Sequence, residues 1–199
     1  MIGSVHDITP QRLAEAARQF PELGDLPAPR TALLVGGTTR CQRLDADYWD
    51  SLLAHLDDWH SAEGGSILVT ASRRTDVPSM IRLQAHFAGR PLRLWRNAAD
   101  GPNPYLGFLA HAQRIVVTPD SVNMLSEACA TGKPVYTHAP QPLRGKLAAF
   151  HRSLRDAGRL HLLGEAEAAW CDEPLLETPA VAEEVWRRYH LRRLASVTP

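Results

Sequence analysis

The sequence has little cysteine. Only three of its 199 residues are cysteines, Cys41, Cys129 and Cys171, and no two of them are spaced as a CxxC pair. An odd number without that spacing argues against a disulfide framework and against a zinc site, and it suits a reducing compartment. We therefore predict that the chain binds no metal, and we expect it in the cytoplasm.

Net charge and long apolar runs are also lacking. The 22 basic and 22 acidic residues cancel, so no overall field draws the chain to nucleic acid, and we expect no nucleic-acid partner. No apolar stretch approaches the roughly 20 residues of a membrane span, and the start, MIGSVHDITP, has no apolar core of a secretory signal. Nearly all the positive charge is arginine, which suits bidentate phosphate contacts, although genomic composition explains the bias better.

What the chain does have is a regular alternation of strand-like and helix-like segments. Short apolar runs occur at residues 31–35, 66–70, 92–95, 115–117 and 135–136. Helix-like segments cover residues 45–59, 77–87, 105–111 and 143–157. Such alternation implies right-handed crossovers, so we predict an α/β fold with a Rossmann-like parallel sheet flanked by helices. We expect a linker and N-terminal helix at residues 1–30, the sheet domain at 31–165, and an extension with a helix at 166–199.

The most informative segment is RIVVTPDSVNMLSEACATGKPVY, residues 114–136. It predicts a buried strand, a polar turn, a helix, a glycine turn at Gly132 and a second strand. Four consecutive residues, Thr118 to Ser121, all suit a helix start, and the pattern leaves open which of them is the N-cap.

This segment also predicts where a ligand binds. The carboxyl end of a parallel strand followed by a helix start presents free amides that favour phosphate, and Asp120 and Ser121 lie at that turn. Glu127 follows within about two helical turns, and a carboxylate there can accept two ribose hydroxyls. The alternative is an ordinary capped helix with a solvated glutamate, and spacing alone does not separate the two interpretations.

A glycine pair follows the first strand, in Gly36-Gly37-Thr38-Thr39-Arg40. Gly36 and Gly37 permit close backbone approach, Thr38 offers a hydroxyl, and Arg40 adds a cation. A plain tight turn accounts for the same residues equally well.

Two further loops follow strands at the same predicted edge. Ser72, Arg73 and Arg74 directly follow the second strand, where adjacent guanidinium groups can clamp a diphosphate; surface ion pairs are the alternative. Asn103 and Tyr105 lie in a turn-rich loop before a helix. They frame a base or sugar, or they simply begin that helix.

The runs GGTTR, TASRRT, NPY and VVTPDSVNMLSEACATGKPVY resemble the mitochondrial-fission-protein-like family of bacteria and plants, whose members are described as glycosyltransferases of the GT-B architecture. The resemblance runs in order from about residue 5 to residue 140. It implies the C-terminal, donor-binding domain of a GT-B enzyme, with a nucleotide-diphosphate sugar as donor substrate and no further cofactor. The site residues that it implies are diphosphate-binding amides at Ser121, Asn123 and Met124, a ribose-binding Glu127, and Gly37, Thr38 and Arg73 along the cleft.

The same resemblance implies that catalysis needs more than this chain. Members of the family are longer, and the sequence starts where a linker and second domain would start, so we expect the acceptor-binding domain to come from elsewhere. We therefore assign no catalytic base. His6, His111 and His138 are candidates only because histidine titrates near neutral pH.

Other functions remain open. The first is a non-catalytic adaptor of the same fold that recruits a protein partner through an exposed tryptophan, Trp95, Trp170 or Trp186. The second is a protein like the nucleotide-sugar epimerases. A helix expected at residues 179–196 carries both aromatic residues and arginines, so it docks on another domain or makes a weak contact with the inner face of an anionic membrane.

Overall fold

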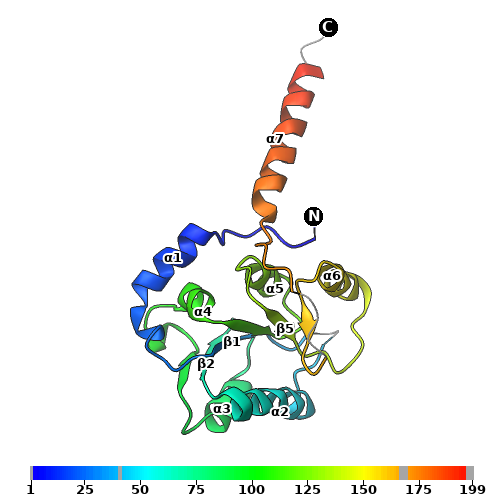
Figure 1. Cartoon of the computed structure of the whole chain (residues 1–199). Coiled ribbons are helices and arrows are strands. Elements are labelled where there is room, and N and C mark those ends of the chain that lie inside the picture. The colour runs from blue at the N-terminus through cyan, green and yellow to red at the C-terminus, as the bar shows by residue number, and fades with distance from the viewer. Residues whose placement is uncertain (1, 40–41, 166–169, 196–199) are drawn as a thin grey trace.

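A six-stranded parallel sheet forms the centre of the molecule. The computed structural model describes residues 2–39, 42–165 and 170–195, and its strands follow the order β3-β2-β1-β4-β5-β6 (Figure 1). The strands are β1 (Arg30–Val35), β2 (Ser66–Ala71), β3 (Leu92–Trp95), β4 (Arg114–Val117), β5 (Val135–Thr137) and β6 (His161–Leu162). Every neighbouring pair is parallel, which confirms the predicted Rossmann-like fold.

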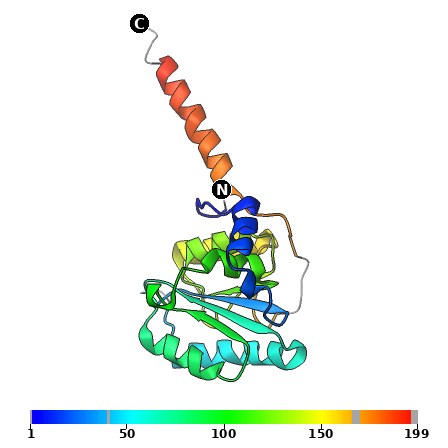
Figure 2. The same cartoon turned by 90° about the vertical axis from the view of Figure 1, so that its left-hand side faces the viewer.

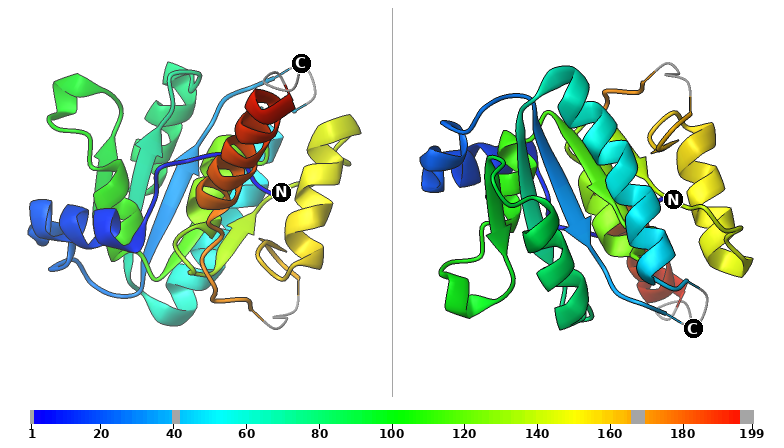
Figure 3. Two further views of the ribbon diagram at one scale, coloured as in Figure 1. Left: turned by 90° about the horizontal axis from the view of Figure 1, so that it is seen from above. Right: turned by 90° about the horizontal axis from the view of Figure 1, so that it is seen from below.

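Helices cover both faces of the sheet. Helices α2 and α3 lie on one face, and α4, α5 and α6 lie on the other, with α1 beside α4 (Figures 1 and 3). The helices are α1 (Pro10–Gln19), α2 (Ala46–Glu63), α3 (Val77–His86), α4 (Tyr105–His111), α5 (Val122–Cys129), α6 (Gly145–Asp156) and α7 (Glu177–Ala195), with short 3₁₀ turns at Pro21–Leu23 and Ala98–Asp100.

The hydrophobic core has two layers because the central strands are buried on both faces. In β1, Ala32 and Leu34 pack toward Leu125 of α5. The alternate residues, Leu33 and Val35, pack toward α2 and α3. This two-sided burial is the reason that β1 reads as a continuous apolar run rather than an alternating one.

The order in which the chain adds strands to the sheet reverses between β1 and β4. The chain moves outward from β1 through β2 to β3, then returns to β4 on the other side of β1, where Leu34 is in register with Val117. In sheets of this kind, ligands bind outside the carboxyl ends of the strands at such a switch point. The loops after β1, β2 and β4 therefore carry the first candidates for a site.

Most predicted elements are confirmed, with differences at their ends. Helix α2 continues to Glu63, four residues past its predicted end, and stops at Gly64, whose φ of 68° favours glycine. Gly132 has a φ of 69°, as the predicted turn requires. The two-residue strand β6 was not predicted. The expected division of the chain at residues 30 and 165 stays a prediction.

Helix α7 points away from the rest of the molecule (Figures 1 and 2). Trp186 on this helix is 65% exposed, as expected of an anchor. For Trp95 and Trp170 the expectation is wrong: both are partly buried against the core, and each donates its indole N–H to a backbone carbonyl. In the ranges that the structure describes, no helix combines the length and the apolar character needed to cross a membrane.

Candidate functional site

Five residues from three loops meet at the switch point, and we call them the strand-end cluster: Gly36, Gly37, Arg74, Thr118 and Asp120. The Asp120 carboxylate accepts hydrogen bonds from the Gly37 amide at 3.1 Å, the Thr118 hydroxyl at 2.7 Å and the Arg74 guanidinium at 2.8 Å. Thr118 in turn accepts from the Gly36 amide at 2.8 Å. The Asp120 side chain is 0% exposed, so the cluster is a fully enclosed carboxylate with a guanidinium partner.

The close packing of this cluster explains the glycine pair. A Cβ atom on Gly36 would lie 2.4 Å from the Asp120 carboxylate oxygens, and one on Gly37 would lie 2.2 Å from the backbone carbonyl oxygen of Arg74. Real Cβ contacts are never this short. The two glycines are therefore required because the other two loops pack closely against them. Neither interpretation of the glycine pair, a plain tight turn or a phosphate-binding loop, predicts this contact.

The two adjacent arginines play different parts. Arg74 pairs with Asp120, and its backbone amide donates to the Ser72 hydroxyl at 3.1 Å. Arg73 is exposed. The predicted clamp of two adjacent guanidinium groups is therefore not assembled here, because one of them is held by a carboxylate. Thr38 accepts from the Leu44 amide at 3.2 Å, and Arg40 lies outside the described residues.

The N-cap of α5, which the sequence left open, is Ser121. Its hydroxyl accepts from the Met124 amide at 3.4 Å, and Asn123 is exposed on the first turn. The Met124 amide thus already has a hydrogen-bond acceptor within the chain. Asp120 does not cap the helix, because its carboxylate belongs to the strand-end cluster.

Glu127 lies in a different place, beside a cavity of about 280 Å³ that we call the Glu127 pocket. Its lining residues are Asp7, Ile8, Arg12, Asn103, Tyr105, Leu106 and Glu127. The Tyr105 hydroxyl donates to the Glu127 carboxylate at 2.5 Å. The structure thus brings together three predicted site residues, Asn103 and Tyr105 at the start of α4 and Glu127 on α5, while the strand-end cluster does not line this pocket.

Burial sets the electrostatics of this pocket. It raises the pKa of Glu127 above its ordinary value, and the Tyr105 hydrogen bond opposes the rise only in part. Burial, followed by the nearby Glu127 charge, also raises the pKa of Tyr105 well above 10. Tyr105 is therefore a neutral donor, and Glu127 is a carboxylate whose described hydrogen-bond partner carries no charge.

One wall of the Glu127 pocket comes from the N-terminal strap, residues 2–8, which the sequence did not connect to the site. The Gly3 amide donates to the Glu177 carboxylate at 2.9 Å, and the His6 amide donates to the Thr178 hydroxyl at 3.0 Å. The Ser4 amide donates to Ser126 on α5 at 2.9 Å. The strap is thus fastened between α5 and the first turn of α7. No local pattern signals contacts between residues this far apart in the chain.

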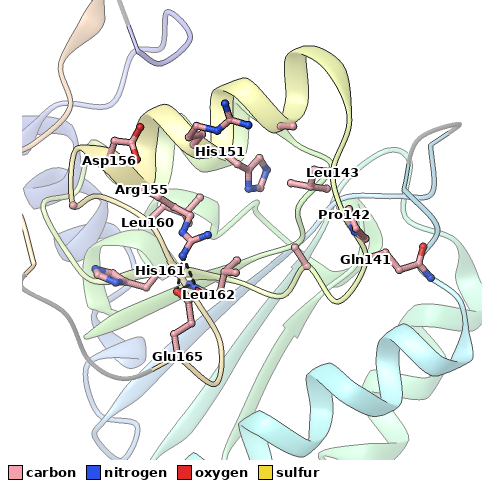
Figure 4. Close-up of a pocket in the computed structure, with 14 residues that line it drawn as sticks. Gln141, Pro142, Leu143, His151, Arg155, Asp156, Leu160, His161, Leu162 and Glu165 are labelled. Atoms are coloured by element: carbon pink, nitrogen blue, oxygen red, sulfur yellow. Dashed lines mark hydrogen bonds and ion pairs between the residues drawn. The ribbon is translucent and has the colours of Figure 1, made fainter.

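A larger cavity of about 660 Å³ lies under α6, and we call it the α6 pocket (Figure 4). The loop after β5, helix α6 and the turn after β6 line it, and the His151 ring points into it (Figure 4). His151 Nε2 donates to the Pro119 carbonyl at 2.8 Å, and burial lowers the pKa of this histidine. An Arg155–Glu165 ion pair of 2.7 Å lies on the same wall. The sequence missed this pocket because it missed β6.

The three histidines named from the sequence have structural surroundings. His6 bonds to the Leu175 carbonyl at 3.0 Å, and His111 bonds to the Ala17 carbonyl at 3.3 Å. Burial lowers the pKa of His138 to about 4, with a further contribution from His55. None of the three lines the Glu127 pocket or the α6 pocket.

The parallel sheet with helices on both faces and its switch point define a protein of the Rossmann-like α/β class. Within that class, a family model described as Mitochondrial fission ELM1 matches residues 1–189. The chain therefore belongs to this family, and the resemblance noted in the sequence is confirmed.

Two curated relatives are similar to this chain in sequence. The chain is 33% identical to the Mitochondrial fission protein ELM1 of Arabidopsis thaliana, over 96% of this chain and 45% of the relative. It is 30% identical to the uncharacterized protein RP120 of Rickettsia prowazekii (strain Madrid E), over 69% of this chain and 39% of the relative. The matches thus cover less than half the length of either relative.

Solved structures add a distant likeness. Two structures of the wall teichoic acid polymerase TagF match 65% of this chain and 27% or 28% of theirs, with TM-scores of 0.34 and 0.32 and 13% identity. At so low a TM-score, the fold assignment rests on the sheet itself.

Proposed function

We propose that this chain binds a nucleotide-diphosphate sugar as the donor-binding, C-terminal domain of a GT-B glycosyltransferase. The observation that carries the proposal is the Glu127 pocket, where a half-buried carboxylate faces a cavity formed by Asn103, Tyr105 and the strap. An ionised carboxylate accepts two hydrogen bonds, so it suits the two hydroxyls of a ribose. The pocket therefore suits the ribose of a nucleoside better than a phosphate group, because the Glu127 carboxylate would repel a phosphate.

The diphosphate then extends toward the start of α5. The exposed first turn at Asn123 and the exposed guanidinium of Arg73 suit its negative charge. In a transfer reaction the same groups would stabilise the leaving diphosphate while an acceptor hydroxyl attacks the sugar. We propose that the acceptor site and the catalytic base lie in a partner or in a further domain, since the chain covers less than half of its curated relatives.

A thermal-shift panel of nucleoside diphosphates and their sugars tests this proposal. A ligand at about 100 times its dissociation constant stabilises the folded state by about 2.7 kcal/mol. We expect Glu127→Gln to weaken binding roughly tenfold, because the amide has no negative charge and only one acceptor oxygen, its other terminal group being an NH2 donor. Glu63→Gln is the matched control, since Glu63 pairs with Arg114 away from the pocket. Absence of a shift with every nucleoside diphosphate would refute the proposal.

A second candidate function, an adaptor that recruits a protein partner, is favoured by α7. Val185, Trp186 and Tyr189 on this helix are 62%, 65% and 52% exposed, and aromatic residues of this kind dominate interface energies. Stable capture of one partner by the wild type but not by Trp186→Ala, together with no nucleotide binding, would favour the adaptor.

We also propose that any membrane contact is weak and involves α7. Arg187 and Arg188 on this helix pair with Glu184, which reduces the charge available to an anionic surface. Co-sedimentation with anionic vesicles at low salt tests this contact. Binding that persists at high salt would contradict weak electrostatic attachment.

A further inference from the structure

The Asp120 carboxylate fills a small anion site that the chain itself builds. Its three donors are the Gly37 amide, the Thr118 hydroxyl and the Arg74 guanidinium, and they come from the loops after β1, β4 and β2. The side chain is 0% exposed, and the guanidinium that covers it is 48% exposed. An anion is thus enclosed at the switch point, under a cation that reaches solvent.

These donors are of the kind that bind phosphoryl oxygens. Backbone amides, hydroxyls and arginine form short charge-assisted bonds to phosphate as they do to carboxylate. The two glycines let the backbone approach this anion, since a Cβ atom on Gly36 would lie 2.4 Å from its oxygens. The same donors cannot hold a carboxylate and a phosphoryl group together, because the two negative charges repel.

The position of the site matches the ligand proposed above. Asp120 directly precedes the N-cap of α5, and Glu127 lies five residues beyond the first residue of this helix, roughly 8 Å along its axis at a rise of about 1.5 Å per residue. A nucleoside 5′-diphosphate bridges such a span, with its ribose at Glu127 and its phosphates at the turn.

We propose that Asp120 is a built-in competitor for the phosphoryl groups of the ligand. Its carboxylate holds the amide, hydroxyl and guanidinium donors in the free protein, and it swings out when a diphosphate takes its place. Free phosphate and pyrophosphate bind weakly because they must displace Asp120 with no other anchor. A nucleoside diphosphate succeeds because the Glu127 pocket holds its other end. The preference for nucleoside diphosphates rests on the proposed nucleotide-sugar function. The anion site that Asp120 occupies, which we call the masked site, does not.

The test is the binding of inorganic pyrophosphate to Asp120→Ala and to the wild type, measured by calorimetry. We expect the variant to bind pyrophosphate at least about tenfold more tightly, since the competing charge is gone and Arg74 is released. The double variant Asp120→Ala, Arg74→Gln should lose most of this gain. Asp57→Ala is the matched control, because Asp57 also pairs with an arginine, Arg90, but on the α2–α3 face. It should bind pyrophosphate like the wild type.

The outcomes separate the two proposals. Equal pyrophosphate affinity in folded Asp120→Ala and wild type overturns the masked site, even where the wild type binds nucleoside diphosphates. A gain in Asp120→Ala without nucleotide binding by the wild type supports the masked site and refutes the proposed function. If Asp120→Ala does not fold, Asp120→Asn keeps the size of the side chain, removes its charge and undergoes the same comparison. A gain of less than about threefold there counts against the masked site.

Discussion

The strand-end cluster and the Glu127 pocket each hold a carboxylate that is at least partly buried, yet the burial is compensated in opposite ways. Asp120 is fully enclosed and paired with the guanidinium of Arg74. Glu127 has a neutral phenol as its hydrogen-bond partner and an open cavity beside it. A buried carboxylate with a cation is satisfied by the protein, whereas one with a neutral partner and free space has capacity left for a ligand.

The largest effect that tests this comparison is expected at Gly37. In Gly37→Ala the new Cβ would lie 2.2 Å from the Arg74 carbonyl oxygen, and backbone cannot yield as a flexible side chain does. We expect a loss of about 3 kcal/mol in the free energy of unfolding, measured by urea denaturation. Gly89→Ala is the control: Gly89 has a φ of 81° and nothing within 4 Å of its Cβ position, so backbone strain alone should cost about 1 kcal/mol. Equal losses in both variants would show that the cluster is not tightly packed.

The next largest difference is expected between Arg74→Ala and Tyr105→Phe. The first leaves the enclosed Asp120 carboxylate without its cation, and we expect a loss of about 2 kcal/mol, reduced from the value for a fully buried pair because Arg74 is half exposed. The second removes one hydrogen bond at a cavity that water can enter, and we expect less than about 1 kcal/mol. Urea denaturation of both variants measures the difference. A larger loss for Tyr105→Phe would reverse the roles that we assign to the two carboxylates.

Strongly punctuated elements are predictable from this sequence. The helix at Tyr105–His111 and the strand at Leu92–Trp95 agree with their predicted ranges, and turn-forming residues directly precede both of them. The N-cap of α5 was not predictable, since four neighbouring residues suit that position and only packing decides. Asp120 serves the cluster instead of the helix because β1 and β2 bring an amide and a guanidinium to it.

The candidate site was only partly predictable for the same reason. The rule that ligands bind at the carboxyl edge brought Asn103, Tyr105 and Glu127 into consideration, and these three line one pocket. The rule did not show that Arg74 would be held by Asp120, nor that residues 2–8 would form a wall. Those features depend on contacts between distant segments, which neither periodicity nor spacing encodes.

The pH dependence of unfolding and of nucleotide binding tests the part that we assign to Glu127 in this comparison. The pKa of Glu127 is raised in the folded protein, chiefly by burial, so the folded state binds its proton more tightly than the unfolded state does. The contribution of this group to stability therefore falls as pH rises from about 4.5 through the raised value. In the same window, nucleotide binding should strengthen as the carboxylate ionises. The difference in unfolding free energy between the wild type and Glu127→Gln, measured against pH, should follow the first trend, because other carboxyl groups titrate in both proteins. Nucleotide binding should strengthen over this window in the wild type and not in Glu127→Gln.

The smallest expected effect concerns the N-terminal strap, which forms one wall of the Glu127 pocket. Thr178→Val removes the hydroxyl that accepts from the His6 amide and donates to the His6 carbonyl. We expect a loss of about 1 kcal/mol in stability and faster amide hydrogen exchange across residues 2–8, because the strap then depends on Glu177 and Ser126 for its position. Nucleotide affinity should fall about threefold, since Asp7 and Ile8 form a wall of the Glu127 pocket. Trp186→Ala, on the same helix but exposed, should leave the exchange of the strap unchanged.

Because the strap does not touch the strand-end cluster through any of these bonds, pyrophosphate binding to Asp120→Ala should be the same with and without Thr178→Val, and a difference would mean that the two regions are coupled.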